Sequence, residues 1–374
     1  MPARVIDIRR VEDLRDVIHQ AVEVLTAGHL VAFPTETVYG VAARALNPGA
    51  VRRLVEAKER RAGHTLTLAL YSAAQARDYV PDMSQLAQRL ARRCWPGPVT
   101  LVLPDSHPEG LSRRLPSEVQ RAVSPQGVIG LRVPGHSLVL EVLRMMPGPL
   151  VLTSAHRTGQ PDARTAQEVI EAWAQEVALV LDDGPTRFGQ PTAVVQVEGC
   201  RYTVLRSGVV PEQTLKRLAS LLILFVCTGN TCRSPMAEAL ARKMLAARLG
   251  CPMEELEEAG VLVSSAGIAA VLGATASPEA IEVMQSYGID LRGHETQPVN
   301  ETLVRHADYI FTMTHAHREA IVAQWPEAAE RTMLLVPEGL DIADPIGGSV
   351  DRYRRCAQQI QQALQARLLE IELP

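Results

Sequence analysis

The chain has 374 residues, which is too long for one ordinary core, and its length favours two or three domains. Its hydrophobic content of 47% allows large cores, and its formal charge of −4 gives no overall preference for nucleic acid or a membrane. The first residues lack the apolar core of a signal sequence, and no run approaches the ~20 apolar residues that cross a bilayer. The six cysteines are scattered, without disulfide or zinc spacing. We therefore expect a soluble, cytoplasmic protein with no membrane partner and no metal site built from cysteines.

The first half alternates helical and strand-like segments. Helical periodicity covers residues 11–27, which end at Gly28, and residues 47–61. Short apolar runs predict strands at 30–33, 66–70, 99–103, 128–132 and 150–153, with a closing hairpin at 193–205. This order predicts a mixed α/β sheet domain over residues 1–210, followed by a linker at 211–221.

The second half, residues 222–374, cycles regularly between strand and helix. Strands are predicted at 222–226, 261–265, 309–313 and 332–336, separated by helices at 234–249, 277–287, 315–324 and 350–371. Ser-Pro pairs at 234–235 and 277–278 are typical helix starts, with serine as the N-cap. Four strands separated by helices predict a doubly wound parallel sheet, with the site at the carboxyl end of its first strand.

That end carries the motif Cys-Thr-Gly-Asn-Thr-Cys-Arg-Ser at residues 227–234. A strand, a tight loop and a helix N-terminus bind anions, because unpaired backbone N–H groups and the helix dipole converge there. A cysteine in that field is biased towards thiolate, and Arg233 can hold two phosphate oxygens at once. The pattern therefore predicts phosphoryl transfer through a phosphocysteine on Cys227.

Together with Ser265-Ala266-Gly267 and Asp344-Pro345, this loop resembles the low-molecular-weight protein tyrosine phosphatases, over the whole of residues 222–374. The resemblance implies Cys227 as nucleophile, Arg233 as phosphoryl ligand and Asp344 as general acid. It also implies that the rest of the loop binds phosphate or orders the site, with Ser234 bonded to the thiolate: Thr228, Gly229, Asn230, Thr231, Cys232 and Ser234. The expected activity needs no cofactor and acts on phosphorylated proteins.

Two departures from the sequence pattern of the tyrosine phosphatases narrow the range of expected substrates. Thr231 stands where they usually carry a bulky aliphatic residue, and Ile346-Gly347-Gly348 where they carry aromatic residues after Asp-Pro. Both features, and the run 312–317, resemble the protein-arginine phosphatase branch. The expected substrates are thus proteins carrying phosphoarginine or phosphotyrosine. The alternative for Thr231 is that its side chain only packs and has no role in substrate choice.

The remaining cysteines leave alternatives open. Cys232 can capture oxidised Cys227 as a reversible disulfide or be an inert buried thiol. Arsenate reduction on the same scaffold is the rival activity, and it would require Cys251 or Cys356 to relay a disulfide.

Five segments of the first half, 33–40, 58–61, 95–100, 130–134 and 153–155, resemble in order and spacing the YrdC-like domain of threonylcarbamoyl-AMP synthases, over residues 5–210. The resemblance implies a reaction of L-threonine, bicarbonate and ATP to threonylcarbamoyl-AMP and pyrophosphate, for tRNA modification, with Mg²⁺ bridging phosphate oxygens. Threonine is expected at Thr35, Arg132 and Thr192, and ATP at Lys58, Arg60, Ser154 and Arg206.

This half departs from the family pattern at several expected ligand positions. Arg61 replaces a proline, Ala69 a histidine, His156 an asparagine and Ala193 one of a hydroxyl pair. His156 cannot offer an amide's donor and acceptor together in one charge state. The alternative is therefore a nucleotide-binding module, or one for double-stranded or transfer RNA, that regulates the phosphatase half.

Overall fold

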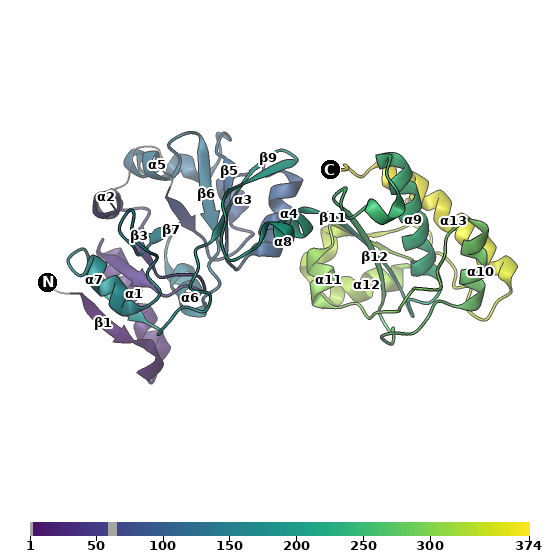
Figure 1. The fold of residues 1–374 in the computed structure, drawn as a ribbon, viewed down its shortest axis with the longest axis horizontal. Coiled ribbons are helices and arrows are strands. Elements are labelled where there is room, and N and C mark those ends of the chain that lie inside the picture. The colour runs from purple at the N-terminus through teal and green to yellow at the C-terminus, as the bar shows by residue number, and fades with distance from the viewer. Residues whose placement is uncertain (1–2, 59–65) are drawn as a thin grey trace. The chain divides into compact units, whose positions relative to one another are not determined.

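The computed structural model describes residues 3–58 and 66–374. The chain divides into two compact units, Met1–Leu218 and Ala219–Pro374, called the N-terminal and C-terminal units below (Figure 1). The boundary falls at the end of helix α8 (Glu212–Ala219), which lies in the segment expected to be a linker. None of the helices in the described ranges is long and apolar enough to cross a membrane.

The N-terminal unit is built on one ten-stranded sheet in the order β1-β8-β2-β3-β7-β4-β6-β5-β9-β10. Its strands are β1 (Arg4–Asp7), β2 (Leu30–Phe33), β3 (Gly40–Arg44), β4 (Thr67–Ala69), β5 (Val99–Pro104), β6 (Val128–Arg132), β7 (Leu150–Ser154), β8 (Val177–Asp182), β9 (Ala193–Glu198) and β10 (Arg201–Arg206). Parallel pairs such as β4 with β6 alternate with antiparallel pairs such as β3 with β7, so the predicted mixed sheet is confirmed.

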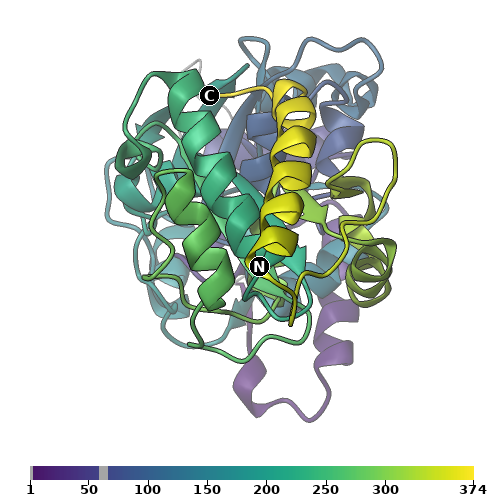
Figure 2. The same ribbon diagram turned by 90° about the vertical axis from the view of Figure 1, so that its right-hand side faces the viewer.

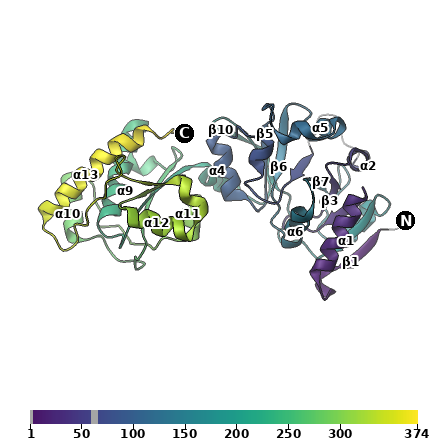
Figure 3. The same cartoon turned by 180° about the vertical axis from the view of Figure 1, so that it is seen from behind.

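Helices cover this sheet and connect its strands. They are α1 (Leu14–Thr26), α2 (Pro48–Ala57), α3 (Ala76–Tyr79), α4 (Gln85–Cys94), α5 (Ser117–Val123), α6 (Ser137–Met145) and α7 (Ala166–Trp173). The apolar faces of α1 and α6 pack together against β2, β7 and β8 (Figure 3). This packing buries a continuous core under one part of the sheet.

The C-terminal unit contains the predicted four-stranded parallel sheet, in the order β12-β11-β13-β14. Its elements are β11 (Leu221–Cys227), α9 (Arg233–Leu249), β12 (Val261–Gly267), α10 (Pro278–Ser286), α11 (Glu301–His306), β13 (Tyr309–Thr312), α12 (His315–Gln324), β14 (Thr332–Leu334) and α13 (Val350–Leu369). Side chains of β11 alternate between two buried faces. Odd positions pack with α9, α10 and α13, which lie side by side in Figure 2, and even positions pack with α11 and α12.

One local prediction was wrong. Ser234 does not cap α9, because the helix already begins at Arg233 and Ser234 lies inside its first turn with a fully buried side chain. Its hydroxyl contacts Cys227 instead of capping backbone N–H groups. The second Ser-Pro start is confirmed, since Ser277 accepts a hydrogen bond from Ala280 N at the beginning of α10.

Candidate active sites

The loop of residues 227–234 joins the carboxyl end of β11 to α9. Its start is held by two backbone hydrogen bonds, from Ile268 N to Cys227 O (3.0 Å) and from Ala269 N to Thr228 O (2.9 Å). Gly267 makes this approach possible, because a Cβ there would lie 2.5 Å from Thr228 O. The Ser-Ala-Gly motif after the second strand is therefore a steric requirement of the loop.

The side chain of Cys227 is almost wholly buried and faces a serine hydroxyl and a backbone N–H. Its Sγ lies 3.0 Å from Ser234 Oγ and accepts a hydrogen bond from Asn230 N at 3.3 Å. Donors aimed at sulfur favour its anionic form, which is the nucleophilic form of cysteine.

Asn230 organises the loop from its centre. It adopts φ +57°, a left-handed conformation that asparagine tolerates better than most residues. Its Nδ2 donates to Ser234 Oγ and Ser265 Oγ, both at 2.9 Å, and its Oδ1 accepts from Gln297 N at 2.9 Å. The backbone carbonyl of Asn230 lies 2.9 Å from His294 Nε2. The role expected for Asn230, ordering the loop, is consistent with these contacts.

Arg233 and Asp344, which lie far apart in the sequence, meet at this loop. Arg233 forms an ion pair through NH2 with Asp344 Oδ2, and it donates to Ile342 O (3.1 Å) and Thr228 Oγ1 (3.3 Å). The Arg233 side chain is 5% exposed, whereas that of Asp344 is 39% exposed. The buried cation is thus fixed, while the carboxylate reaches it from a surface loop.

His317 is a residue of this site for which the sequence suggested no role. It is buried at the start of α12, with Nε2 2.9 Å from Thr228 Oγ1 and Nδ1 2.9 Å from Thr314 Oγ1. Burial, and then the nearby charge of Arg233, lower the pKa of His317 to about 4. The imidazole is therefore neutral near pH 7 and holds Thr228. Its position in the run 312–317 was the only available signal.

Thr231, Cys232 and Cys356 have different surroundings in this part of the unit. Thr231 Oγ1 contacts Cys232 Sγ at 3.4 Å, and Cys232 Sγ also lies 3.2 Å from the hydroxyl of Tyr353. Burial raises the pKa of the Cys356 thiol to about 12, which makes it a poor nucleophile and a poor relay for arsenate reduction.

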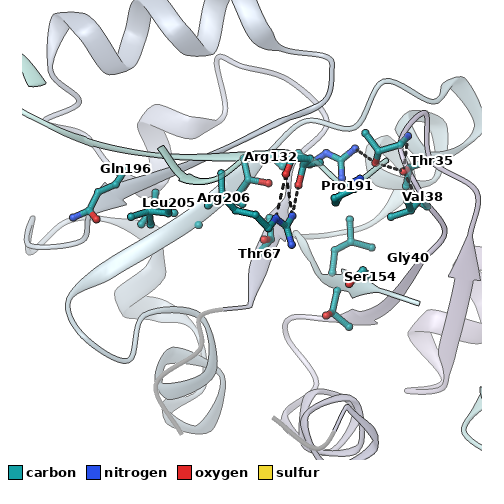
Figure 4. Close-up of a pocket in the computed structure, with 18 of the residues that line it drawn as sticks. Thr35, Val38, Gly40, Thr67, Arg132, Ser154, Pro191, Gln196, Leu205 and Arg206 are labelled. Carbon is teal, nitrogen blue, oxygen red and sulfur yellow. Dashed lines mark hydrogen bonds between the residues drawn. The ribbon is translucent and has the colours of Figure 1, made fainter. Parts of the chain in front are cut away.

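The N-terminal unit contains a cavity of about 420 Å³ (Figure 4). It lies over β4, β5, β6 and β9, and the segment between β2 and β3 closes one end. Five of the predicted ligand residues line it, namely Thr35, Arg132, Ser154, Thr192 and Arg206. Sequence reasoning missed Thr67, Thr100, Gln126 and Gln196, which are isolated polar residues on or beside apolar strands.

Two guanidinium groups face this cavity. Arg206 donates to Thr192 Oγ1 at 2.8 Å, and burial, with a further contribution from the charge of Arg132, lowers its pKa. Arg132 already has an internal partner, because its NH2 donates to Glu36 Oε1 at 2.7 Å and both side chains are 7% exposed. A carboxylate entering here would therefore meet an arginine whose charge is partly balanced.

Lys58 contacts residues at the edge of the cavity without lining it. Its Nζ donates to Ser154 O at 2.9 Å and to His156 O, although Lys58 itself does not line the cavity. His156 is engaged with Asp162, with 2.7 Å between Nδ1 and Oδ1. Ala69 and Ala193 are buried and do not line the cavity, and Arg60 and Arg61 lie outside the described residues.

Comparison with known proteins assigns each half of the chain to a family. The family model described as low molecular weight phosphotyrosine protein phosphatase matches residues 222–372, and the one described as telomere recombination, for YrdC-type domains, matches residues 23–208. A protein-arginine-phosphatase of Bacillus subtilis is 36% identical over 38% of this chain and 91% of its own length. A threonylcarbamoyl-AMP synthase of Klebsiella pneumoniae is 36% identical over 46% of this chain and 85% of its own length. The chain belongs to both families.

We refer to the two parts below as the synthase-family unit and the phosphatase-family unit. A threonylcarbamoyl-AMP synthase of Pyrococcus abyssi is 33% identical over 57% of this chain but only 60% of its own length. The chain thus spans less than two thirds of that relative. The resemblances found in the motifs of both halves are confirmed by these matches.

Proposed function

We propose that the phosphatase-family unit hydrolyses phosphorylated proteins through a phosphocysteine on Cys227. The supporting observation is that Cys227 Sγ lies within hydrogen-bonding distance of Ser234 Oγ and Asn230 N, with the buried Arg233 in the same loop. This arrangement stabilises a sulfur anion and binds a phosphoryl group beside it.

The chemistry requires two displacements. Cys227 Sγ attacks phosphorus, the bond to the leaving atom breaks, and Asp344 gives that atom its proton. Asp344, now a carboxylate, takes a proton from water, whose oxygen attacks phosphorus and breaks the S–P bond to release inorganic phosphate. Because Asp344 pairs as a carboxylate with Arg233 in the free enzyme, phosphoryl oxygens that occupy Arg233 would release Asp344 to take up from solvent the proton that it then gives to the leaving atom.

Two variants of the full chain test this mechanism with an aryl phosphate. Cys227→Ser should abolish turnover, and Asp344→Asn should slow release of poor leaving groups more than good ones, since only the former need protonation. Mass spectrometry of the enzyme quenched during turnover should place a phosphoryl group on Cys227. A phosphoryl group on another residue, or undiminished turnover by Cys227→Ser, would refute the mechanism.

Phosphoarginine is the substrate that the walls of the site favour. Ile346, 65% exposed two residues after Asp344, is an aliphatic side chain on which a phenyl group cannot stack as it would on an aromatic ring. A hydroxyl at Thr231 can accept a hydrogen bond from a guanidinium. Thr231→Ile should shift the ratio of kcat/KM towards phosphotyrosine over phosphoarginine peptides, and an unchanged ratio would contradict this assignment.

The synthase-family unit is proposed to convert L-threonine, bicarbonate and ATP into threonylcarbamoyl-AMP, pyrophosphate and water. The support is a cavity of suitable size in which two arginines and several hydroxyls converge, as binding of an amino acid and a nucleotide requires. Threonine would lie near Thr35 and Arg132, and phosphates near Ser154 and Arg206. The product would serve modification of an adenosine in tRNA.

Among the described residues, the lining of the cavity provides no protein site for Mg²⁺. Its described lining has no carboxylate, the ligand with which proteins usually hold this ion, so Mg²⁺ would enter already bound to ATP. Demand for ATP, and a catalytic thiol among six free cysteines, suit the cytoplasm.

A specific observation also favours the alternative of a binding module. Glu36 already occupies Arg132, and Ala69 and Ala193 remove polar groups expected in the family. The deciding measurement is pyrophosphate release from ATP by the purified chain. Release that requires both threonine and bicarbonate supports the synthase, whereas binding of ATP without such release supports the module.

A further inference from the structure

The phosphatase-family unit has a cavity of about 390 Å³ beside α9. We call it the α9 cavity. It is bounded by α9, the 3-10 helix Met253–Glu255 and the segment 289–294, and neither Cys227, Arg233 nor Asp344 lines it. It is therefore separate from the phosphoryl site.

The α9 cavity is lined by two opposite charges, Glu238 and Arg242, and no salt bridge involving either of them is found in the described part of the chain. Glu238 and Arg242 lie one helical turn apart on α9, at a spacing that normally allows an ion pair, yet no salt bridge or hydrogen bond joins them. Glu238 Oε2 accepts from Ser265 Oγ at 2.7 Å, which leaves Oε1 available. Asp290, also in the lining, is by contrast neutralised by Arg292 at 2.7 Å.

The rest of the lining indicates what would fit between these charges. Met253, Ile289 and Leu291 supply an aliphatic surface, and Ile289 and Leu291 belong to the hydrophobic core. An α-amino acid with an apolar side chain has the matching chemistry: its ammonium group suits Glu238, its carboxylate suits Arg242, and its side chain packs on the aliphatic surface.

The α9 cavity is connected to the nucleophile by hydrogen bonds. Glu238 accepts from Ser265, Ser265 accepts from Asn230, and Asn230 also donates to Ser234, which contacts Cys227 Sγ. His294, which lines the same cavity, contacts the carbonyl of Asn230. A cation bound at Glu238 would stabilise the carboxylate and keep the Ser265 hydroxyl donating towards it. This effect adds to the other contacts that hold Asn230.

We propose that the α9 cavity binds an apolar α-amino acid that raises the turnover of the phosphatase site through Glu238, Ser265 and Asn230. The effect on turnover rests on the phosphatase function proposed above, whereas binding does not. Burial raises the pKa of Glu238 because it disfavours the charged carboxylate. A cationic ligand beside Glu238 would favour the ionised form and oppose this effect.

The test uses the full chain and L-leucine as probe, with isoamylamine and 4-methylpentanoate as analogues that lack the carboxylate or the ammonium group. L-leucine should bind in calorimetry and raise kcat for an aryl phosphate severalfold. Neither analogue should bind comparably. Arg242→Gln should lose binding and the response while keeping basal turnover, and Glu254→Gln, a change of an exposed carboxylate in the lining, is the matched control.

Ser265→Ala separates binding from its effect, since this variant should still bind L-leucine but show no rise in kcat. Absence of binding at millimolar L-leucine, or equal binding by Arg242→Gln, would overturn the site. Binding that leaves kcat unchanged in the unmodified chain would overturn the connection to the nucleophile. If the chain showed no phosphatase activity at all, calorimetry would still decide whether the site exists.

Discussion

Replacement of Asn230 tests how far the loop depends on one buried residue. Asn230→Ala removes three side-chain hydrogen bonds, to Ser234, Ser265 and Gln297, from a position with no solvent exposure. At about 0.5–1.5 kcal/mol each, their loss should lower the free energy of unfolding by about 3 kcal/mol. Alanine at φ +57° adds about 1–2 kcal/mol of backbone strain.

Asn230→Gly is the matched control for that strain. It loses the same hydrogen bonds but adopts the left-handed conformation freely, at an entropic cost of about 0.5–1 kcal/mol relative to alanine. The alanine variant should therefore be less stable than the glycine variant by about 0.5–1 kcal/mol. Both variants should lose most turnover of an aryl phosphate, because Ser234 and the N–H of residue 230 are no longer held on Cys227.

Hydrogen exchange measured by mass spectrometry can show separately how much stability each of the two units loses in these variants. Peptides from residues 219–374 should show the loss of protection, and peptides from residues 1–218 provide an internal reference. If both variants lost less than about 1 kcal/mol, Asn230 would not be the organising residue we infer. Equal stability of the two variants would refute the argument from backbone strain.

Three further predictions concern other buried contacts. Glu36→Gln leaves the buried charge of Arg132 without its counter-ion and should lower the free energy of unfolding of the N-terminal unit by about 3–5 kcal/mol, measured by hydrogen exchange of its peptides; a loss below about 1 kcal/mol would contradict the buried pair. Folding lowers the pKa of His317 from 6.5 to about 4, so as the pH falls the unfolded chain takes up a proton on this histidine before the folded chain does. The free energy of unfolding should therefore be full above pH 6.5 and fall towards pH 4, by at most about 1.4 kcal/mol per pH unit. His317→Gln should flatten that slope. Gly267→Ala places a Cβ 2.5 Å from Thr228 O and should strongly reduce kcat for an aryl phosphate, and unchanged kinetics would show that the loop tolerates the displacement.

Much of the phosphatase-family unit was predictable because its signals are local. A wholly apolar strand, a loop that contains Cys227 and Arg233, and a helix follow one another within a short stretch, and periodicity predicted all four strands of the sheet. The helix start was misplaced because serine before proline is a common N-cap, whereas here the Ser234 hydroxyl is engaged by Cys227 and Asn230. A tertiary contact thus overrode a local preference.

The synthase-family unit was less predictable for a physical reason. Strands β1, β3 and β8 were not predicted, since β3 (Gly40–Arg44) follows the polar loop without alternation and β1 is a short edge strand. The pairing of β3 with β7, more than a hundred residues later, depends on the packing of the whole sheet. Glu36 looked like one polar residue in a loop until the fold placed it against Arg132.

By itself, the sequence predicted the two-part organisation and the strand–loop–helix that carries Cys227 and Arg233, because short-range spacing and periodicity carry that information, and its motifs carried the resemblance to both families. Only the tertiary structure decided which distant groups meet: Asp344 with Arg233, His317 with Thr228, and Glu36 with Arg132. Such contacts are set by how strands and loops far apart in the chain pack together, and this packing also creates the α9 cavity. No local pattern of residues specifies them.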